Sequence, residues 1–155
     1  MEIRRAVRED LEGINNLLCQ VLELHHKGRP DLFYGGVKKY SDEELYAILE
    51  DDTRPVFVAV EGKKVLGYAF LIHQQIQNSH ILTDVRTLYL DDLCVDESAR
   101  GMGIGKKLYE FVVDFAKKEG FYNLTLNVWS CNPGALRFYE KCGMVPQKVY
   151  METIL

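Results

Sequence analysis

The chain has 155 residues, which suits a single domain able to bury about two-thirds of its unfolded surface. The hydrophobic share of 47% and the charged share of 27% are ordinary for a soluble globular protein. The net charge of −4 disfavours a nucleic-acid-binding protein, because such proteins usually present a basic stripe and the lysines here are scattered among acids. The acidic balance slightly favours a positively charged small substrate. We expect one domain spanning residues 1–155.

Targeting and metal signals are not found in the sequence. The first ten residues, MEIRRAVRED, carry charges where a signal peptide needs an apolar core. The longest apolar runs have the length of strands and are too short to span a bilayer, so no membrane partner is expected. The four cysteines lack C-x-x-C spacing and are expected to be reduced thiols in a cytoplasmic protein. The histidines have no metal-ligand spacing, so we expect no metal.

The first third of the chain predicts one strand and two helices. EIRRAV alternates as a short strand does. Apolar residues then recur with the three-four spacing of an amphipathic helix over residues 9–25. Ser41, with Glu44 three residues later, has the form of a capping box that opens a second helix.

The rest of the chain alternates strands with helices. Residues 55–74 read as two strands around a Glu61-Gly62 turn, and VRTLYLDDLCV as another strand. A helix follows the stretch ARGMGIGKKL and ends at Gly120. This order predicts an α+β fold in which helices flank a mixed sheet. The remaining expected elements are a strand at 123–128, a short helix at 132–143 and a last strand at 147–155.

The stretch ARGMGIGKKL places three alternate glycines at the start of a helix. The first N–H groups of a helix lack internal partners and carry about half a positive charge between them. Glycines let a polyphosphate approach these donors, and basic side chains add charge-assisted contacts. The stretch therefore predicts a pyrophosphate site formed by Arg100, Gly101, Met102, Gly103, Ile104, Gly105 and Lys106.

Three phosphate-binding patterns compete for this stretch. A P-loop requires G-x-x-x-x-G-K-[ST], but Lys107 follows Lys106 and Arg100 stands where the first glycine belongs. A dinucleotide-binding loop requires G-x-G-x-x-G near the first strand, but the third glycine comes one residue early and the stretch lies two-thirds along the chain. The pattern R/Q-x-x-G-x-G/A is matched in full by Arg100, Gly103 and Gly105.

Together with the later stretch NPGALRFYEKCGM, this loop resembles the GCN5-related N-acetyltransferase (GNAT) family. The resemblance covers residues 3–155 in the order of elements. It implies a mostly antiparallel sheet of six to seven strands, about four helices and a splayed pair of central strands. It also implies acetyl-CoA as cosubstrate, with Asn132 on the pantetheine arm and Tyr139 protonating the departing thiolate. The strand before the loop would pair with the pantetheine through Leu93, Cys94 and Val95.

Transfer to an amine also needs a base. A lysine-like amine has a pKa of about 10.4, so its neutral form at pH 7 costs about 4.6 kcal/mol. Asp91 and Asp92 lie just before the loop and resemble an acidic pair in the spermidine/spermine N-acetyltransferases. Alternation sends them to opposite faces unless a bulge intervenes. We expect Asp91 to be the base and Asp92 to be an amine-orienting or structural partner. The glutamate of histone acetyltransferases would fall at Tyr89, which disfavours a histone-type reaction.

The predicted function is direct acetyl transfer to the primary amine of a small cationic molecule, whether polyamine-like, aminoglycoside-like or amino-acid-like. In the family the two early helices wall the acceptor site, so Phe33 and Tyr34 between them are candidates to line it. The alternatives are acetylation of a protein N-terminal α-amine and a non-catalytic CoA-binding sensor. An acetyl-cysteine intermediate on Cys94 is a rival mechanism, although a buried thiol is the preferred interpretation. Many relatives are dimers, and the last strand could contribute to a homodimer.

Overall fold

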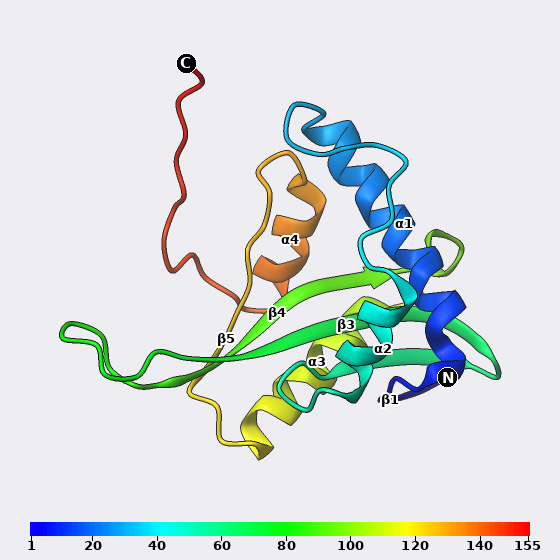
Figure 1. Cartoon of the computed structure of the whole chain (residues 1–155), viewed down its shortest axis with the longest axis horizontal. Helices are drawn as coiled ribbons and strands as arrows, with labels where there is room; N and C mark the ends of the chain where they lie inside the picture. The colour runs from blue at the N-terminus through cyan, green and yellow to red at the C-terminus, as the bar shows by residue number, and fades with distance from the viewer.

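The fold is built on one five-stranded sheet with the strand order β1-β2-β3-β4-β5 (Figure 1). The computed structural model describes all 155 residues. The first four strands pair antiparallel, whereas β5 is parallel to β4, so the sheet is mixed as expected. The strands are β1 (Glu2–Arg5), β2 (Val56–Glu61), β3 (Lys64–Gln75), β4 (Arg86–Val95) and β5 (Asn123–Thr125).

Four α-helices accompany the sheet, which confirms the predicted α+β class. The predicted capping box is present, because Glu44 N–H donates to Ser41 Oγ at 3.1 Å and Ser41 N–H donates to Glu44 Oε2 at 2.9 Å. The first helix begins two residues later than predicted and is preceded by a 3-10 turn, η1 (Arg8–Asp10). The helices are α1 (Leu11–Gly28), α2 (Asp42–Glu50), α3 (Ile104–Lys118) and α4 (Pro133–Lys141), with a second 3-10 turn, η2 (Glu97–Ala99), before α3.

Alternation along β2 divides the core into two sides. Val56, Val58 and Val60 belong to a buried cluster with side chains of α1 and α2. Phe57 and Ala59 point the other way and join clusters with side chains of α3. Because successive strand residues face opposite sides, one strand holds α1 and α2 on one face of the sheet and α3 on the other.

A glycine in β3 allows α3 to lie close to the sheet. A Cβ at Gly67 would lie 2.8 Å from the carbonyl oxygen of Cys94 and 3.0 Å from Cδ1 of Leu108. Any side chain here would push α3 away from β3. Gly67 therefore helps to set the start of α3 beside the end of β4.

The number of strands differs from the prediction of six to seven. The expected strand at 147–155 is absent, and the strand expected at 123–128 is reduced to the three residues of β5. A strand exists only where a neighbour completes its hydrogen-bond ladder. No backbone hydrogen bond involves residues 145–155, so this segment is extended chain without a partner. It runs from α4 away from the sheet (Figure 1).

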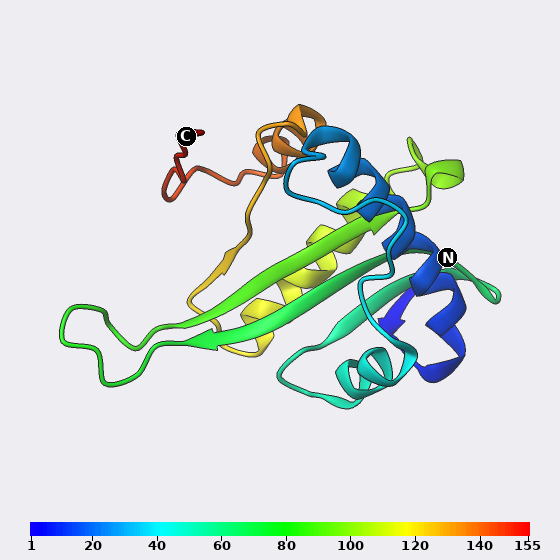
Figure 2. The same cartoon turned by 45° about the horizontal axis from the view of Figure 1, so that its top comes forward.

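The pairing of β4 is interrupted on both of its edges. On the β5 side it covers only Thr87–Tyr89, after which β4 continues alone and the chain beyond β5 diverges from it (Figure 2). On the β3 side the register shifts between Phe70 and Leu71, so that Asp91 is the extra residue of a β-bulge.

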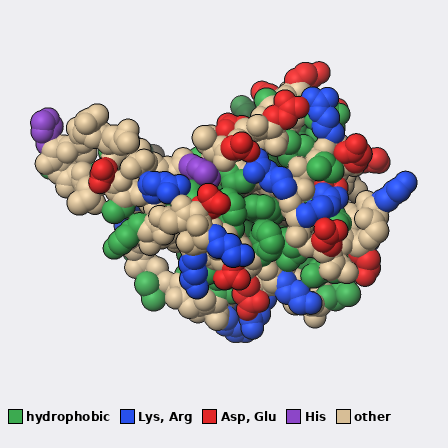
Figure 3. Space-filling view, turned by 90° about the horizontal axis from the view of Figure 1, so that it is seen from below, with side chains coloured by type: hydrophobic (Ala, Val, Ile, Leu, Met, Phe, Trp, Pro, Cys, Tyr) green, Lys and Arg blue, Asp and Glu red, His purple; other side chains and the backbone are tan.

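The surface combines apolar areas with charged surroundings. Figure 3 shows hydrophobic side chains grouped in the middle of one face and charged side chains around them, while the loop between β3 and β4 projects to one side. None of the helices combines the length and the hydrophobicity that crossing a bilayer requires.

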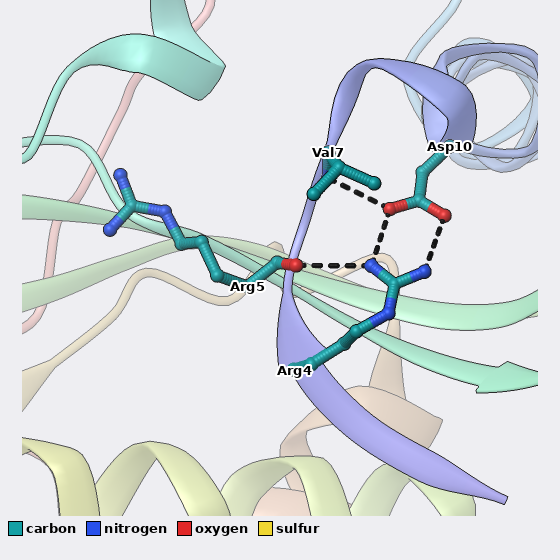
Figure 4. A network of polar contacts seen from close by, with 4 residues as sticks. All are labelled: Arg4, Arg5, Val7 and Asp10. Atoms are coloured by element: carbon teal, nitrogen blue, oxygen red, sulfur yellow. Dashed lines mark hydrogen bonds and ion pairs between the residues drawn. The ribbon is translucent and has the colours of Figure 1, made fainter.

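An ion pair joins β1 to the start of α1 (Figure 4). The Arg4 guanidinium donates two hydrogen bonds to the Asp10 carboxylate, at 2.7 and 3.0 Å. The same carboxylate accepts from Val7 N–H at 2.8 Å, and Arg4 also donates to the carbonyl oxygen of Arg5. Burial alone would raise the pKa of Asp10, but the hydrogen bonds from Arg4 and Val7 and the charge of Arg4 together outweigh it and hold this pKa below its usual value.

Replacing Asp10 by Asn should lower the free energy of unfolding at pH 7 by about 2 kcal/mol, since bonds to a charged group are lost. The folded pKa of Asp10 is lowered, so its contribution is present above the unfolded pKa of about 3.9 and is lost as the pH falls through the folded value. The difference from the parent should therefore shrink on acidification. Denaturant unfolding at neutral and acidic pH measures it.

The matched control is Asp52→Asn, because the Asp52 side chain is 99% exposed and meets Arg5 only at 3.5 Å. This control should leave stability unchanged. Equal stability of the parent and the Asp10→Asn variant at pH 7 would contradict the role given to the ion pair.

Candidate active site

The glycine-rich loop has the open backbone that the sequence predicts. Gly101 and Gly103 have φ values of 80° and 74°, which lie in the left-handed region that favours glycine. No atom lies within 4 Å of a Cβ placed at either residue. Gly103 is the N-cap of α3, and the first turn of α3 contains no acidic residue. The loop thus presents free N–H donors to open space at a positive helix end.

The side chains of this loop divide between surface and core. Met102 is exposed, whereas Ile104 is buried in the cluster beneath α3 and can serve a ligand only through its backbone. Arg100 Nε donates to the carbonyl oxygen of Val95 at 3.4 Å, which holds the guanidinium near the end of β4. Lys106 lies 3.7 Å from Glu110 on the surface of α3. The donor set fits a pyrophosphate.

Gly105 brings three elements together. A Cβ at this residue would lie 3.4 Å from the ring of Phe138 on α4 and 3.6 Å from Cγ2 of Val95 on β4. The start of α3, the end of β4 and α4 therefore meet at one place. These are the segments from which the sequence predicts cofactor contacts.

The end of β4 offers one free edge. Leu93, Cys94 and Val95 pair with β3 on one side, and β5 provides no partner for them on the other. This is the edge that could pair with a pantetheine arm. Cys94 itself is buried, and burial raises the pKa of its thiol to about 12. Such a thiol is a poor source of thiolate, which disfavours an acetyl-cysteine intermediate.

Helix α4 carries Asn132 and Tyr139. The Asn132 Oδ1 atom caps the helix by accepting from Ala135 N–H at 3.2 Å, which leaves the Nδ2 group available to donate to a ligand. Tyr139 is half-buried against the rings of Tyr109 and Phe138. Burial, and then the charge of Asp92, raise the pKa of Tyr139 well above its usual value. The phenol therefore stays protonated at neutral pH.

The bulge changes how the two aspartates are placed. Strict alternation would send Asp91 and Asp92 to opposite faces, but both carboxylates interact with the same ammonium group, that of Lys39. Asp92 accepts a hydrogen bond from the Tyr68 hydroxyl at 2.7 Å, and Tyr68 is fully buried. Burial raises the pKa of Asp92 by more than Tyr68 and Lys39 lower it.

Lys39 places a primary amine directly beside the acidic pair. Its Nζ atom lies 3.6 Å from Asp91 Oδ2, with 32% of the Lys39 side chain and 25% of the Asp91 side chain exposed. Burial would lower the pKa of Lys39, but the charges of Asp91 and Asp92 outweigh it and the pKa is raised. The site therefore holds an ammonium group against two carboxylates.

Three aromatic rings, those of His25, Phe33 and Trp129, pack together at the end of α1. Phe33 packs against Trp129 with ring centroids 5.1 Å apart and against His25 at 5.0 Å. This contact joins the loop between α1 and α2 to the segment after β5. Burial, and then the charge of Lys39, lower the pKa of His25. Phe33 thus lies in the neighbourhood of Lys39, whereas Tyr34 is 85% exposed and is not brought to the site.

Several residues of this site carry no signal in the sequence. Lys39 lies in a loop without periodicity, and Trp129 reads as core although 40% of it is exposed. His25 reads as a favourable cation at a helix end. Tyr68 could have been suspected only from its place on a strand opposite the acidic pair.

Comparisons with known proteins identify the family of this chain. A model of the acetyltransferase (GNAT) family matches residues 20–144. The glucosamine 6-phosphate N-acetyltransferase of Arabidopsis thaliana is 29% identical over 115 residues, covering 74% of this chain and 68% of that protein. The peptidyl-lysine N-acetyltransferase YjaB of Escherichia coli is 26% identical over 144 residues, covering 92% of this chain and 81% of that protein.

A solved structure is similar over the whole chain. The crystal structure of a mutant of the BH1408 protein from Bacillus halodurans has a TM-score of 0.95 at 32% identity, covering 100% of this chain and 99% of that one. Family model, relatives and fold therefore agree, and the chain belongs to the GNAT family of acetyltransferases and is an N-acetyltransferase enzyme.

Proposed function

We propose that the protein transfers an acetyl group from acetyl-CoA to the primary amine of a small molecule. The observation that carries this proposal is the ammonium group of Lys39, 3.6 Å from Asp91 and close to Asp92. This contact supports the proposal, because the group beside the two carboxylates is itself a primary amine. The charge of Asp92 contributes to the raised pKa of Tyr139, so the candidate acid lies near the same two carboxylates.

The glycine-rich loop and α4 are the proposed holders of acetyl-CoA, which supplies the activated acetyl thioester. Arg100, Lys106 and the N–H groups at the start of α3 would bind the pyrophosphate. Asn132 Nδ2 and the free edge of β4 would hold the pantetheine arm. A backbone N–H at that edge is also the donor that would polarise the reacting carbonyl group.

Asp91 is the proposed base, directly or through a water molecule. Burial raises the pKa of Asp92, but this carboxylate is bonded to the buried Tyr68, whereas Asp91 is partly exposed and can meet an incoming amine. Asp92 and Tyr68 would position this end of β4. Tyr139 is the proposed acid, because its phenol stays protonated until charge develops on the departing sulfur.

One further observation supports a small acceptor, because a relative acts on an amino sugar phosphate, by its name. The acidic pair supports a cationic amine of the kind that spermidine-type enzymes use. A lysine side chain on a peptide is the second candidate, because the group now beside Asp91 is itself a lysine and another relative is named for peptidyl-lysine.

Gly103→Val should abolish acetyl-CoA binding, because a branched side chain would stand where the pyrophosphate approaches the α3 N-terminus. Isothermal titration calorimetry with acetyl-CoA measures the effect. Gly62→Val is the matched control, since Gly62 has a similar φ of 60°, equally open surroundings and a place in the β2–β3 turn. The control should cost similar stability and keep affinity. A folded Gly103→Val variant with parental affinity would refute the loop assignment.

Asp91→Asn should lose most activity near neutral pH and recover part of it at about pH 9.5, where bulk solvent supplies neutral amine. Asp114→Asn, at an exposed position on α3, is the control and should match the parent throughout. The pH profile of kcat/KM is the measurement. A deficit that is constant with pH would assign Asp91 to positioning and would transfer the base role to Asp92.

Tyr139→Phe should lower kcat by about 10²- to 10⁴-fold, the usual worth of general acid assistance, while acetyl-CoA affinity changes little because the ring still packs. The assay is release of free CoA thiol from acetyl-CoA with a panel of small amines, amino sugars and lysine peptides. Tyr122→Phe, at a tyrosine that is 74% exposed, is the control. A panel without any accepted amine would sink the proposed function, and a near-normal kcat would remove only Tyr139.

A further inference from the structure

The side chain of Lys39 occupies the position that the proposed function assigns to the acceptor amine. Its Nζ atom lies 3.6 Å from Asp91 Oδ2, and the charges of both Asp91 and Asp92 act on it. A lysine is a primary amine on a flexible aliphatic stem, so Lys39 has the chemistry of an acceptor as well as the position of one. The proposed transfer to a small molecule leaves this group without a role.

Lys39 also lies at the opening between β4 and the chain beyond β5. On the β4 side it meets Asp91, which precedes the free-edge residue Leu93 by two positions, or about 7 Å of strand. On the other side its charge acts on His25, whose ring centroid lies 6.4 Å from that of Trp129 in the segment after β5. An acetyl thioester held along the free edge of β4 would therefore approach the Lys39 side chain.

The loop that carries Lys39 has the freedom that a transfer requires. Residues 29–41 contain no helix or strand, and the backbone of residues 34–40 makes no hydrogen bond with other backbone groups. Tyr40 anchors the loop, because its ring stacks on that of the buried Phe70 with centroids 6.1 Å apart. Lys39 is thus attached next to a fixed point, while its own side chain is 32% exposed and free to turn.

We propose that the protein acetylates its own Lys39, which makes this lysine a site of self-modification. The inference rests on the proposed function, because it uses the same base, the same acid and the same acetyl donor. It goes beyond that function by naming a residue of the chain itself as an acceptor.

The transfer balances with the groups already described. Asp91 removes a proton from the Lys39 ammonium and passes it to solvent, and the neutral Nζ atom attacks the acetyl carbonyl carbon. A C–N bond forms and the C–S bond to CoA breaks. Tyr139 donates its proton to the departing sulfur and regains one from the nitrogen, directly or through water. The products are Nζ-acetyl-lysine, the free thiol of CoA and a proton in solvent.

The reaction should occur once per chain. Acetylation replaces the ammonium group of Lys39 by a neutral amide, which no longer forms an ion pair with a carboxylate. The contact that held the amine beside Asp91 is then lost. Self-acetylation would therefore leave the two carboxylates free for the amine of another molecule.

Lys38 is the matched control within the same loop. Its Nζ atom is bonded to Asp42 of α2 at 2.5 Å, and 48% of its side chain is exposed. An uncatalysed reaction with acetyl-CoA would favour Lys38, because Lys39 is less exposed and the charges of the acidic pair outweigh burial and raise the pKa of Lys39. Catalysis would reverse this order, since only Lys39 lies beside the proposed base.

Incubation of the full-length protein with acetyl-CoA that carries an isotope-labelled acetyl group, without any added amine, tests the inference. Mass spectrometry of its peptides should find label on Lys39 at about 10²-fold or more the rate of Lys38, the lower end of what a positioned base contributes. The half-time should not depend on protein concentration, because each chain modifies itself. Lys39→Arg should lose this label, and Lys38→Arg should keep it.

Asp91→Asn should also lose acetylation of Lys39, including any unlabelled acetyl group that the parent acquires during expression. Equal labelling of Lys38 and Lys39, or a half-time that shortens in proportion to protein concentration, would overturn the inference. The amine panel is assayed with the same preparation. CoA release with an added amine but no acetyl group on Lys39 would overturn this inference alone, whereas the absence of both reactions would overturn the proposed function as well.

Discussion

The structure depends on the separation of β4 from β5. β4 pairs with β3 from Arg86 to Val95 except at the bulge residue Asp91, but its pairing with β5 stops at Tyr89. Beyond that point one edge of β4 is free within the fold. An unpaired edge in the middle of a sheet is costly unless another backbone or a ligand satisfies its N–H and C=O groups. The separation therefore creates the place where an extended ligand can lie.

The neighbouring elements are arranged around this open edge. Gly67 lets α3 approach β3 closely, which sets the N-terminus of α3 at the end of β4. Gly105 then allows the ring of Phe138 to rest on the same helix start, so α4 stands on the other side of the opening. A positive helix end, a free strand edge and a protonated tyrosine thus border the same space. The arrangement suits a ligand that carries a pyrophosphate at one end and a reacting group at the other.

The acidic end of this space is shaped by a single extra residue. The bulge at Asp91 brings its carboxylate and that of Asp92 toward the same ammonium group, which a regular strand would prevent. The two acids then differ in their surroundings. Asp92 is tied to a buried phenol and has a raised pKa, while Asp91 is partly open and paired with Lys39. When two neighbouring carboxylates have unequal environments, one can orient an amine while the other removes its proton.

Local patterns in the sequence determined the class of the fold, the order of its elements and the glycine-rich loop. The capping box at Ser41 and the left-handed glycines at 101 and 103 depend on neighbours within a few residues, so residue types and spacing are enough to predict them. The same holds for Asn132 and Tyr139, which lie two turns apart on one helix.

Only the tertiary structure decided the features that join distant segments. The bulge at Asp91 is a property of its register with β3, and the place of Lys39 beside Asp91 depends on how the loop before α2 folds back over the sheet. The prediction of six to seven strands was wrong for the same reason. Residues 147–155 have the pattern of a strand, but a strand also requires a partner across a ladder, and these residues make no backbone hydrogen bond.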